Sequence, residues 1–482
     1  MKHFGHLYVD GSWVPPSGPG QRELVDPTTE EAFATIAVGG GVGDVNNAVA
    51  AARRAFAGFS KSTVGERIDL INRIISAYEE RLDEFADVLA QEVGVPKTLR
   101  AQATGPAAHM KVARDLLKTY PFEKRIADTI IRREPIGVCA LIAPWNWPIQ
   151  TPVIKFIYAL AAGCPVVLKP SDASPVVAIM LAEVMEKAGT PKGVFNLVIG
   201  KGRVVGEAMA SHPDVDMISF TGSTGAGIKV GEAAARTVKR ASLELGGKSA
   251  NIVLKDADLE KAARWNVQRC FMNAGQSCHA PSRMLVHESQ MEDVIPYLVD
   301  EAAKFRIGDP RRPETTMGPL VNAAQFDSVQ GYIRIGIEEG ARMVAGGLGR
   351  PDGLNRGFFT KPTVFAGVTP DMTIARDEIF GPVLAVMPYS SEEDALRTAN
   401  DSIFGLGGYV FSKDRKRGYD FASGLRAGRV SFNGANTNSL TPMGGYKQSG
   451  IGRSMGVFGL EEYLEVKSIY GFEQEASDLP EV

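Results

Sequence analysis

Two short segments carry residue types suited to covalent chemistry. Cys278 lies in a polar turn rich in small residues, and Glu244 lies 34 positions earlier among leucines and glycines. A thiolate attacks a carbonyl carbon well and also leaves well. A glutamate bracketed by leucines and glycines can be desolvated enough to act as a general base. Together the two residues indicate covalent chemistry on an aldehyde or an acyl group.

The other cysteines have a different setting. Cys139 and Cys164 lie in apolar runs, so we expect both to be buried as small hydrophobic residues. Cys270 and Cys278 are eight positions apart, which is no zinc-ligand spacing, and we expect no metal site. Four cysteines in 482 residues do not form a disulfide framework, which fits a reducing compartment. Taken alone, Cys278 is as compatible with a structural thiol near a turn as with a nucleophile.

Length and composition limit the class of protein. A chain of 482 residues is too long for one ordinary core and indicates two or three domains. Its 44% hydrophobic and 23% charged residues are typical of a globular protein, and a net charge of −3 gives no support for nucleic-acid binding. The first residues lack the apolar stretch of a signal peptide, and no long apolar run indicates a membrane span. We expect a cytoplasmic protein with no nucleic-acid or membrane partner.

Short β-type runs alternate with longer helical stretches, which predicts a parallel, doubly wound α/β sheet. A second α/β series begins near residue 246. The expected strands of the first series are 140–144, 165–169, 194–198 and 217–221, and its helices are 151–162, 177–187, 204–211 and 226–237. The expected strands of the second series are 249–254, 282–287, 381–387, 408–412 and 428–432, and its helices are 259–272, 291–304, 325–340 and 393–400.

Two β-prone segments belong to neither series. Residues 126–134 precede the first strand of the first series, and residues 465–471 lie near the C-terminus. We expect them to pair as a separate small sheet, whose exposed edges would invite partner strands. Residues 473–482 are acidic and poor in large apolar groups, which predicts a loose tail.

Ligands of open α/β sheets bind at the carboxyl ends of the strands, and three such ends carry candidate groups. A Pro-Trp-Asn-Trp-Pro segment holds Asn146, whose amide suits an oxyanion, although the segment also reads as a rigid turn. Lys169 and Asp172 suit ribose hydroxyls, but this fragment alone favours a solvated loop pair. The glycine-rich turn from Gly222 to Gly227 opens a helix and suits phosphate, although the G-x-G-x-x-G fingerprint is absent.

Seven motifs, in order and spacing, resemble those of the NAD(P)-dependent aldehyde dehydrogenase superfamily, and the resemblance covers residues 5–469. They are Pro-Trp-Asn-Trp-Pro at 144–148, Lys-Pro-Ser-Asp at 169–172, Phe-Thr-Gly-Ser-Thr at 220–224, Leu-Glu-Leu-Gly-Gly-Lys at 243–248, Gly-Gln-Ser-Cys at 275–278, Glu-Ile-Phe-Gly-Pro at 378–382 and Gly-Gly-Tyr-Lys-Gln-Ser-Gly at 444–450.

The resemblance implies a three-part subunit that assembles as a homodimer or homotetramer. Residues 1–122 and 136–245 correspond to the dinucleotide-binding domain, 246–440 to the catalytic domain, and 123–135 and 463–482 to the oligomerisation segments. It also implies oxidation of an aldehyde to a carboxylic acid with NAD(P)+. Cys278 resembles the nucleophile that forms a thiohemiacetal and then a thioester. Asn146 and the Cys278 backbone N–H resemble the oxyanion hole, and Glu244 resembles the base that activates water.

The family pattern also implies positions that hold the cofactor. Lys169 and Asp172 match the adenine-ribose contacts, Ser223 a pyrophosphate contact, and Glu378 the nicotinamide-ribose contact with Phe380 beside it. Trp145 and Gly202 match positions on the adenosine side. The full set of expected cofactor residues is Ile142, Trp145, Lys169, Asp172, Gly202, Phe220, Gly222, Ser223, Leu245, Glu378 and Phe380.

Two departures concern the cofactor and the proton path. The family usually has glutamate where Asp172 stands, and Arg203 follows Gly202, so NADP is an alternative to the favoured NAD. The family also has a glutamate, implicated in a proton relay with a lysine, where this chain has Ser454. The lysine is kept as Lys155. We expect hydrolysis to survive with an altered pH dependence.

The expected substrate tunnel is partly aromatic, partly flexible and partly polar, which predicts a medium-sized aromatic aldehyde or an oxo-acid semialdehyde. A bulky aromatic is common in the family where Met443 stands. The main alternative is a CoA-acylating semialdehyde dehydrogenase, but that subgroup lacks the base that Glu244 provides. The expected tunnel residues are Trp147, Ile154, Met272, Ser277, His279, Thr437 and Met443.

Overall fold

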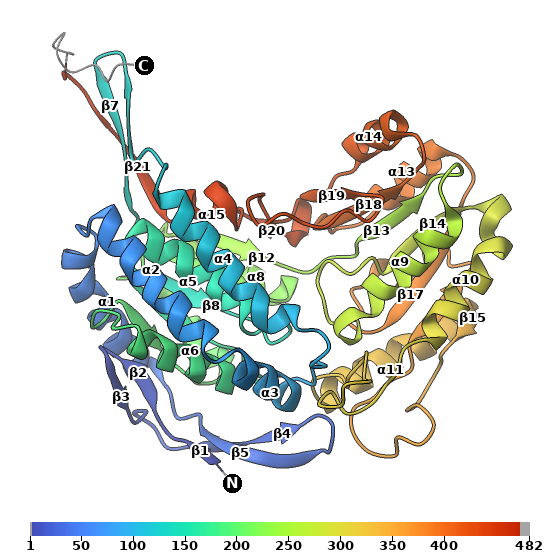
Figure 1. Cartoon of the computed structure of the whole chain (residues 1–482), viewed down its shortest axis with the longest axis horizontal. Helices are drawn as coiled ribbons and strands as arrows, with labels where there is room; N and C mark the ends of the chain where they lie inside the picture. The colour runs from blue at the N-terminus through green and yellow to red at the C-terminus, as the bar shows by residue number, and fades with distance from the viewer. Residues whose placement is uncertain (1, 473–482) are drawn as a thin grey trace.

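The computed structural model describes residues 2–472 and contains two lobes with a small sheet that projects from one of them (Figure 1). Each lobe has its own hydrophobic core around its own sheet. The predicted α/β fold class is confirmed. The acidic segment 473–482, expected to form a loose tail, lies outside the described residues.

The first lobe is built on an eight-stranded sheet whose central strands are fully buried and parallel. Apolar runs such as Val-Val-Leu in β9 are typical of strands covered on both faces. In spatial order the strands are β20 (Gly450–Ile451), β12 (Arg240–Glu244), β11 (Met217–Thr221), β8 (Cys139–Ile142), β9 (Val166–Lys169), β10 (Phe195–Leu197), β2 (Leu7–Val9) and β3 (Ser12–Val14).

The strand order reverses direction between β8 and β11, which are neighbours in the sheet. The chain runs outward through β8, β9 and β10, then returns to the other side of β8 for β11 and β12. Such a switch point opens a crevice at the carboxyl ends of the strands. The helices of this lobe are α1 (Val42–Phe59), α2 (Val64–Glu79), α3 (Leu82–Glu92), α4 (Ala101–Leu117), α5 (Gln150–Ala162), α6 (Pro175–Lys187), α7 (Glu207–Ser211) and α8 (Thr224–Ala235).

The second lobe contains a seven-stranded sheet that is parallel except for its edge strand β15. Its strands, in spatial order, are β15 (Arg342–Ala345), β16 (Thr363–Ala366), β17 (Val383–Tyr389), β14 (Arg283–His287), β13 (Ala250–Val253), β18 (Gly407–Phe411) and β19 (Arg429–Phe432). Its helices are α9 (Leu259–Phe271), α10 (Met291–Ala303), α11 (Ala323–Glu338), α12 (Thr373–Arg376), α13 (Glu392–Asn400) and α14 (Arg415–Gly424).

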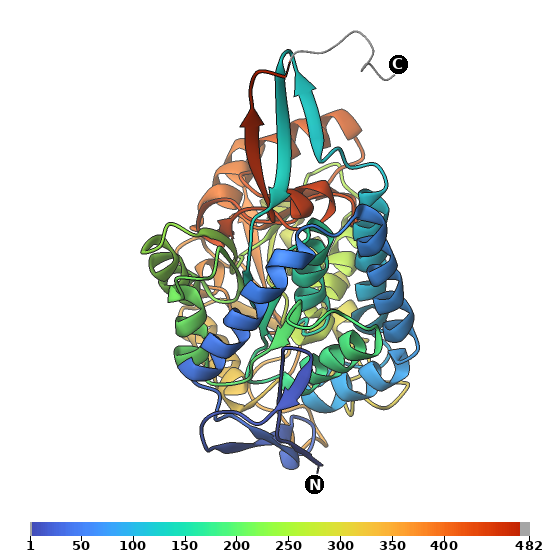
Figure 2. The same ribbon diagram turned by 90° about the vertical axis from the view of Figure 1, so that its left-hand side faces the viewer.

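The two orphan β segments do pair, as predicted. Strand β21 (Leu464–Ile469) runs antiparallel to β7 (Thr129–Pro135), which also pairs with β6 (Glu123–Ile126). This small sheet extends away from the body of the subunit (Figure 2). A further small sheet near the N-terminus contains β1 (Lys2–Phe4), β5 (Glu31–Ala37) and β4 (Gln21–Asp26).

Some local predictions were wrong. The expected helix 204–211 is a π-helical turn, η1 (Gly202–Gly206), followed by the short α7. The last turn of the expected helix 259–272 is also different, because α9 ends at Phe271 and a 3-10 turn, η2 (Met272–Gly275), takes over. Three short segments complete the fold: η3 (Glu288–Gln290), η4 (Lys447–Ser449) and α15 (Gly456–Glu461).

Candidate active site

The loop that carries the candidate nucleophile is held in an unusual backbone conformation. After α9, Asn273 and Ala274 have φ of 56° and 53°, and Gly275 has φ of 73°. A Cβ on Gly275 would lie 2.1 Å from the backbone of Gly381, so only glycine fits there. This reversal of the chain brings Cys278, a half-buried free thiol, to the wall of a cavity.

Asn146 is locked against this loop. Its side-chain Nδ2 donates to the backbone carbonyl oxygen of Gln276 at 3.0 Å. The backbone carbonyl oxygen of Asn146 accepts from Asn273 Nδ2, also at 3.0 Å. Gln102 Nε2 donates to the same carbonyl at 3.2 Å. An amide nitrogen has two N–H groups, and Gln276 takes one of them. The second can donate to a substrate oxygen close to Cys278.

Glu244 is the last residue of β12 and is buried in the same cavity. Burial raises the pKa of its carboxyl group to about 7, while Lys155 and the Ser454 hydrogen bond pull it down. Ser454 Oγ donates to Glu244 Oε1 at 3.0 Å, and Oε2 is buried with no hydrogen-bond partner among the described residues. A carboxyl group with a pKa near neutrality and one open oxygen can take a proton from water.

Lys155 lies on α5 beside this carboxyl group. Burial lowers the pKa of its ammonium group to about 8, while the charges of Glu244 and Glu462 favour the protonated form. Its Nζ donates to Ser219 Oγ at 2.7 Å. The structure therefore brings Lys155 into the electrostatic environment of Glu244, without a direct hydrogen bond between them among the described contacts.

The environment of Cys278 raises the pKa of its thiol. Burial and the nearby charge of Glu378 raise its pKa to about 12, while Arg429 and its own backbone N–H lower it. A thiol becomes a nucleophile only as the thiolate. Cys278 therefore needs a nearby base or an added positive charge before it can attack a carbonyl carbon.

The cavity in front of Cys278 has a volume of about 570 Å³, which suits a medium-sized molecule. Six of the seven expected tunnel residues line it. Ser277 does not line it, because Ser277 is buried and accepts a hydrogen bond from Trp147 Nε1 at 3.2 Å. The tunnel residues that line the cavity are Trp147, Ile154, Met272, His279, Thr437 and Met443.

The expected cofactor residues gather at the carboxyl edge of the first sheet. Lys169 and Ile142 end β9 and β8, and Phe220, one residue before the end of β11, lies in register with them. Gly222 follows β11, and Ser223 caps α8 by accepting from the Ala226 backbone N–H at 3.4 Å. The exposed first turn of α8 points its free N–H groups at this edge, which suits an anionic phosphate.

A second hollow lies beyond this edge. Asp172 and Gly202 line it together with Arg22, Lys201 and Arg203. Lys169 Nζ donates to Asp172 Oδ1 at 3.1 Å, and Arg22 donates to the Asp172 carbonyl, so the loop is fixed from both sides. The pair Lys169 and Asp172, which looked like a solvated loop pair in isolation, has its lysine buried.

The third group of expected cofactor residues is centred on Glu378, which contacts the backbone at the start of the second lobe. Glu378 Oε1 accepts from the Gly247 backbone N–H at 2.9 Å, and burial raises the pKa of its carboxyl group to about 7. A Cβ on Gly246 would lie 2.3 Å from Glu378 Oε2. The backbone of Leu243–Gly247 is thus shaped around this carboxyl group, with Leu245 at the cavity wall.

Trp145 packs against Phe380, another of the expected cofactor residues. Its ring lies edge-on to Phe380, with centroids 5.4 Å apart, rather than in the hollow that contains Gly202. Phe380 has φ of 56° and directly follows the segment of Glu378. The structure therefore groups Trp145 with Phe380 and Glu378.

Two arginines at the cavity were missed in the sequence. Arg269 and Arg429 both line it, alongside Trp265 and Tyr409. A helical spacing was available as a signal, because Arg269 precedes the expected tunnel residue Met272 by three positions. Arg429 lies in a predicted strand, and a single sequence does not say which face of that strand meets the cavity.

The chain was compared with known proteins. The model of the aldehyde dehydrogenase family matches residues 13–469. The chain is 47% identical to a 3-succinoylsemialdehyde-pyridine dehydrogenase of Pseudomonas sp, over 98% of this chain and 100% of that protein.

Solved structures agree over the same length. The chain is 48% identical to a mutant of aldehyde dehydrogenase C from Pseudomonas syringae in complex with NAD+ and octanal, with a TM-score of 0.96 and 98% of each chain covered. It is 40% identical to an aldehyde dehydrogenase of Mycobacterium tuberculosis complexed with NAD+, with a TM-score of 0.95 and 98% of each chain covered. This chain belongs to the aldehyde dehydrogenase family.

Proposed function

We propose that this protein oxidises an aldehyde to a carboxylic acid with NAD+ through a covalent thioester on Cys278. The observation that carries the proposal is the convergence of Cys278, Asn146 and Glu244 on one cavity. A nucleophile, an oxyanion donor and a general base are the three groups that acyl transfer requires.

The residues present fit a nicotinamide dinucleotide. The α8 N-terminus suits the pyrophosphate, Lys169 and Asp172 suit the adenine ribose, and Glu378 suits the nicotinamide ribose. Relatives at 48% and 40% identity were crystallised with NAD+, which supports the same cofactor here. When bound, the nicotinamide accepts a hydride from the substrate carbon. NADP remains the alternative because Arg203 and Lys201 line the hollow near Asp172.

In the first half-reaction the Cys278 thiol gives its proton to solvent, the thiolate sulfur bonds to the aldehyde carbon, and the carbonyl oxygen gains the negative charge. The free N–H of Asn146 and the Cys278 backbone N–H stabilise that oxygen. Loss of a hydride from the same carbon restores the C=O bond and leaves a thioester on Cys278.

In the second half-reaction Glu244 removes a proton from water, and the resulting hydroxide attacks the thioester carbon. The tetrahedral intermediate collapses, the carboxylic acid is released, and the sulfur leaves as the thiolate. The pKa of Glu244, raised to about 7 by burial, suits a base that accepts and returns a proton near neutral pH.

We propose a medium-sized aromatic aldehyde or an oxo-acid semialdehyde as the substrate. The cavity volume of about 570 Å³ and its mixed aromatic and polar wall support this size and character. Two relatives are associated with medium-sized aldehydes. One acts on a succinoylsemialdehyde-pyridine by its name, and the other was crystallised with octanal.

Oxidation with transfer to CoA is the rejected alternative. The presence of Glu244 with an open oxygen beside Cys278 argues for hydrolysis, because a CoA-acylating enzyme needs no base to activate water. Adding CoA to the assay tests this directly. The hydrolytic proposal expects free acid and no acyl-CoA, and acyl-CoA formation would contradict it.

We further propose that residues 123–135 and 463–472 join copies of this chain in a homodimer or homotetramer. The exposed side chains of Ile126 and Val466 on the small sheet support this role. Residues 1–122 and 136–245 would bind the cofactor, and residues 246–440 would carry the thiol. Free thiols at all four cysteines support a cytoplasmic location. No helix in residues 2–472 is long and apolar enough to pass through a membrane.

A panel assay tests the proposed activity. Aliphatic, aromatic and carboxylated aldehydes are each offered with NAD+ and with NADP+, and absorbance of the reduced cofactor is followed. Turnover that requires Cys278, measured against Cys278→Ala, supports the proposal. Silence from every aldehyde with both cofactors would overturn it.

A further inference from the structure

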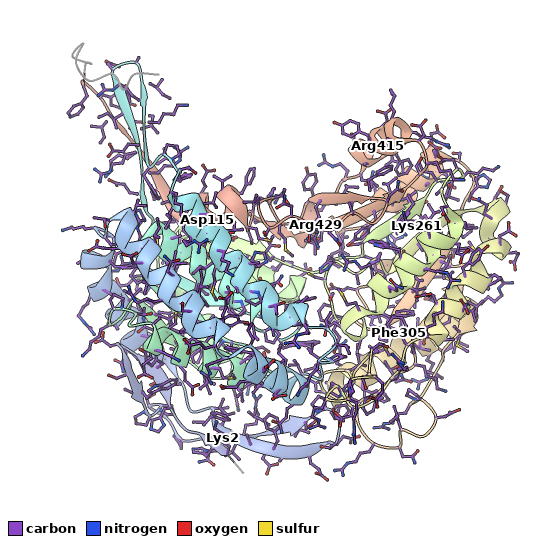
Figure 3. The ribbon with its side chains drawn as sticks, in the orientation of Figure 1. Lys2, Asp115, Lys261, Phe305, Arg415 and Arg429 are labelled. Atoms are coloured by element: carbon purple, nitrogen blue, oxygen red, sulfur yellow. The ribbon has the colours of Figure 1, made fainter. Side chains whose placement is uncertain are left out.

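Two guanidinium groups face the cavity beside the nucleophile. Arg269 lies near the end of α9 and Arg429 is the first residue of β19, and both are half-buried. Figure 3 labels Arg429 in the middle of the molecule, where the two lobes meet. Both charges lower the pKa of His279, the residue after Cys278, well below its ordinary value, in addition to the larger effect of burial. Both guanidinium groups therefore lie close enough to His279, the neighbour of Cys278, for their charges to be felt there.

The described ion pairs between α9 and α10 involve a different arginine, Arg264. Arg264 binds Glu260, Asp300 and Glu301 at 2.8–2.9 Å, on the outer side of α9. The described side-chain contacts of Arg269 are with an aromatic ring and a thioether sulfur. Its guanidinium lies 5.9 Å from the Trp265 ring centroid, and its Nη1 lies 3.9 Å from the Met272 sulfur. Among the described ion pairs, none involves Arg269 or Arg429.

The cavity itself offers these arginines little compensation. Glu244 is the single carboxylate among its described lining residues, and its charge is shared, because Lys155, Ser454 and Arg429 all act on it. Two half-buried cations that have only a share of one carboxylate are costly, because burial removes the water that would solvate them. A ligand that carries a negative charge removes this cost, and an arginine fork matches a carboxylate in shape.

An aromatic wall connects the two arginines to the thiol. Trp265 packs on Tyr409 with ring centroids 5.0 Å apart, and the Tyr409 hydroxyl donates to the carbonyl of His279 at 2.7 Å. His279 in turn lies near Trp147, with ring centroids 6.5 Å apart. The cavity thus has a reactive end at Cys278, apolar sides, and a cationic region at Arg269 and Arg429.

We infer that Arg269 and Arg429 form a carboxylate-binding subsite, and that the preferred substrate is an aldehyde bearing a carboxylate at its far end. This inference rests on the proposed function and chooses the oxo-acid class within it. The arginines are specificity residues, because they hold the part of the substrate that does not react.

Matched pairs of aldehydes test the inference. The first pair is 4-formylbenzoate and its methyl ester, and the second is 4-oxobutanoate and its methyl ester. Each pair differs in charge and little in shape. We expect kcat/KM to favour the acid by about 10- to 100-fold, mostly through KM, as a charged hydrogen bond would give. Added salt should reduce the rate with the acid more than with the ester. Equal or better turnover of both esters would overturn the inference.

Variants assign the effect to these side chains. Arg269→Gln should reduce the acid-to-ester ratio of kcat/KM about 10-fold or more, while kcat with the esters is kept. Arg429→Gln should reduce the same ratio, and its effect on the Cys278 thiol, which is common to acid and ester, cancels in that ratio. Arg269→Lys should restore part of the ratio, because the charge returns without the fork. Arg415→Gln is the control and should leave the ratio unchanged, because Arg415 is an exposed residue of α14 that does not line the cavity and lies well away from Arg429 in Figure 3. If neither glutamine variant changed the acid-to-ester ratio, the assignment of the subsite to these arginines would be wrong.

A binding measurement separates this inference from the proposed activity. Calorimetry with Cys278→Ala and terephthalate needs no turnover, and it should detect binding that Arg269→Gln in the same background weakens about 10-fold or more. If no aldehyde is oxidised but terephthalate binds through Arg269, the activity is wrong and the subsite stands. If esters are oxidised well and terephthalate does not bind, the subsite is wrong and the activity stands.

Discussion

The hydroxyl of Ser454 donates a hydrogen bond of 3.0 Å to Oε1 of Glu244. A glutamate in place of Ser454, as the family pattern has, would bring a second carboxyl group to this point. Two neighbouring carboxyl groups raise each other's pKa. The serine does the opposite, because its hydroxyl donor lowers the pKa of Glu244. With serine at position 454, the carboxyl group of Glu244 therefore has a lower pKa than it would have beside a second carboxyl group, and more of it is ionised near pH 7.

Removing that donor should shift the pH dependence of the reaction. In Ser454→Ala the pKa of Glu244, about 7 in the native protein, should rise by about one unit, as loss of a hydrogen bond to a charged group implies. The ionised form is the active base, so kcat at pH 7 should fall and recover at higher pH. The acidic limb of kcat between pH 5.5 and 9 measures this shift. Ser454→Thr keeps the hydroxyl and is the control, and superimposable profiles for wild type and Ser454→Ala would refute the role.

Glu244→Gln should stop the reaction after its first half. A glutamine cannot take a proton from water, so the thioester on Cys278 should accumulate. We expect one equivalent of reduced cofactor per site in a rapid burst, followed by a steady rate lowered about 100-fold or more. Stopped-flow absorbance measures the burst, and intact-protein mass spectrometry detects the acyl adduct. Unchanged steady-state production of reduced cofactor would show that another group activates the water.

Asp172 should control the choice between NAD and NADP. Its carboxylate repels a 2′-phosphate, whereas Arg22, Lys201 and Arg203 line the same hollow and would attract one. Asp172→Ser should raise the ratio of kcat/KM for NADP+ over NAD+ by about 10- to 100-fold, by removing that repulsion. Asp172→Glu restores the carboxylate of the family pattern and should keep the preference for NAD+. A ratio that is the same in wild type and Asp172→Ser would exclude this control.

Charge on the small sheet should disrupt assembly if residues 463–472 join subunits. Val466 lies on β21 with 64% of its surface exposed, although its side chain is apolar. Val466→Glu would place a charge in an apolar contact between copies, which is costly. Light scattering after gel filtration should show a smaller assembly than wild type. Val42→Glu, at an exposed valine on α1, is the control, and an unchanged mass for Val466→Glu would argue against this interface.

The parallel core of the fold could be predicted because its strands are continuous apolar runs. Residues 166–169 of β9 and 139–142 of β8 are wholly buried, and such runs between helical stretches have few other interpretations. The hairpin β2–β3 and the edge strand β20 were missed, because strands of two or three residues show no periodicity. Pairing of distant segments supplies their stability.

The reactive groups of the site could also be predicted, because their residue types are rare in such surroundings. Orientation within the cavity could not. Ser277 and Cys278 are neighbours, yet one lies behind Trp147 and the other faces the cavity. Arg269 looks like any exposed arginine of a predicted helix, and only the fold shows that it lines the same cavity as Arg429 of β19. Side-chain direction of this kind follows from tertiary packing rather than from local pattern.

The turn at Gly275 should be essential to the site, because it touches both halves of the proposed chemistry. In Gly275→Ala the new Cβ would lie 2.1 Å from the backbone of Gly381, in the segment that follows Glu378. The loop of Cys278 and the segment of Glu378 would have to move apart together. We expect kcat/KM to fall about 100-fold or more, because a small misplacement of reacting groups costs rate steeply.

Gly189→Ala is the matched control, since Gly189 has φ of 66° and no atom within 4 Å of an added Cβ. It should lose about 1–2 kcal/mol of unfolding free energy from the left-handed backbone alone and keep its activity. Equal loss of activity in both variants would mean that backbone strain, and not the contact with Gly381, accounts for the effect.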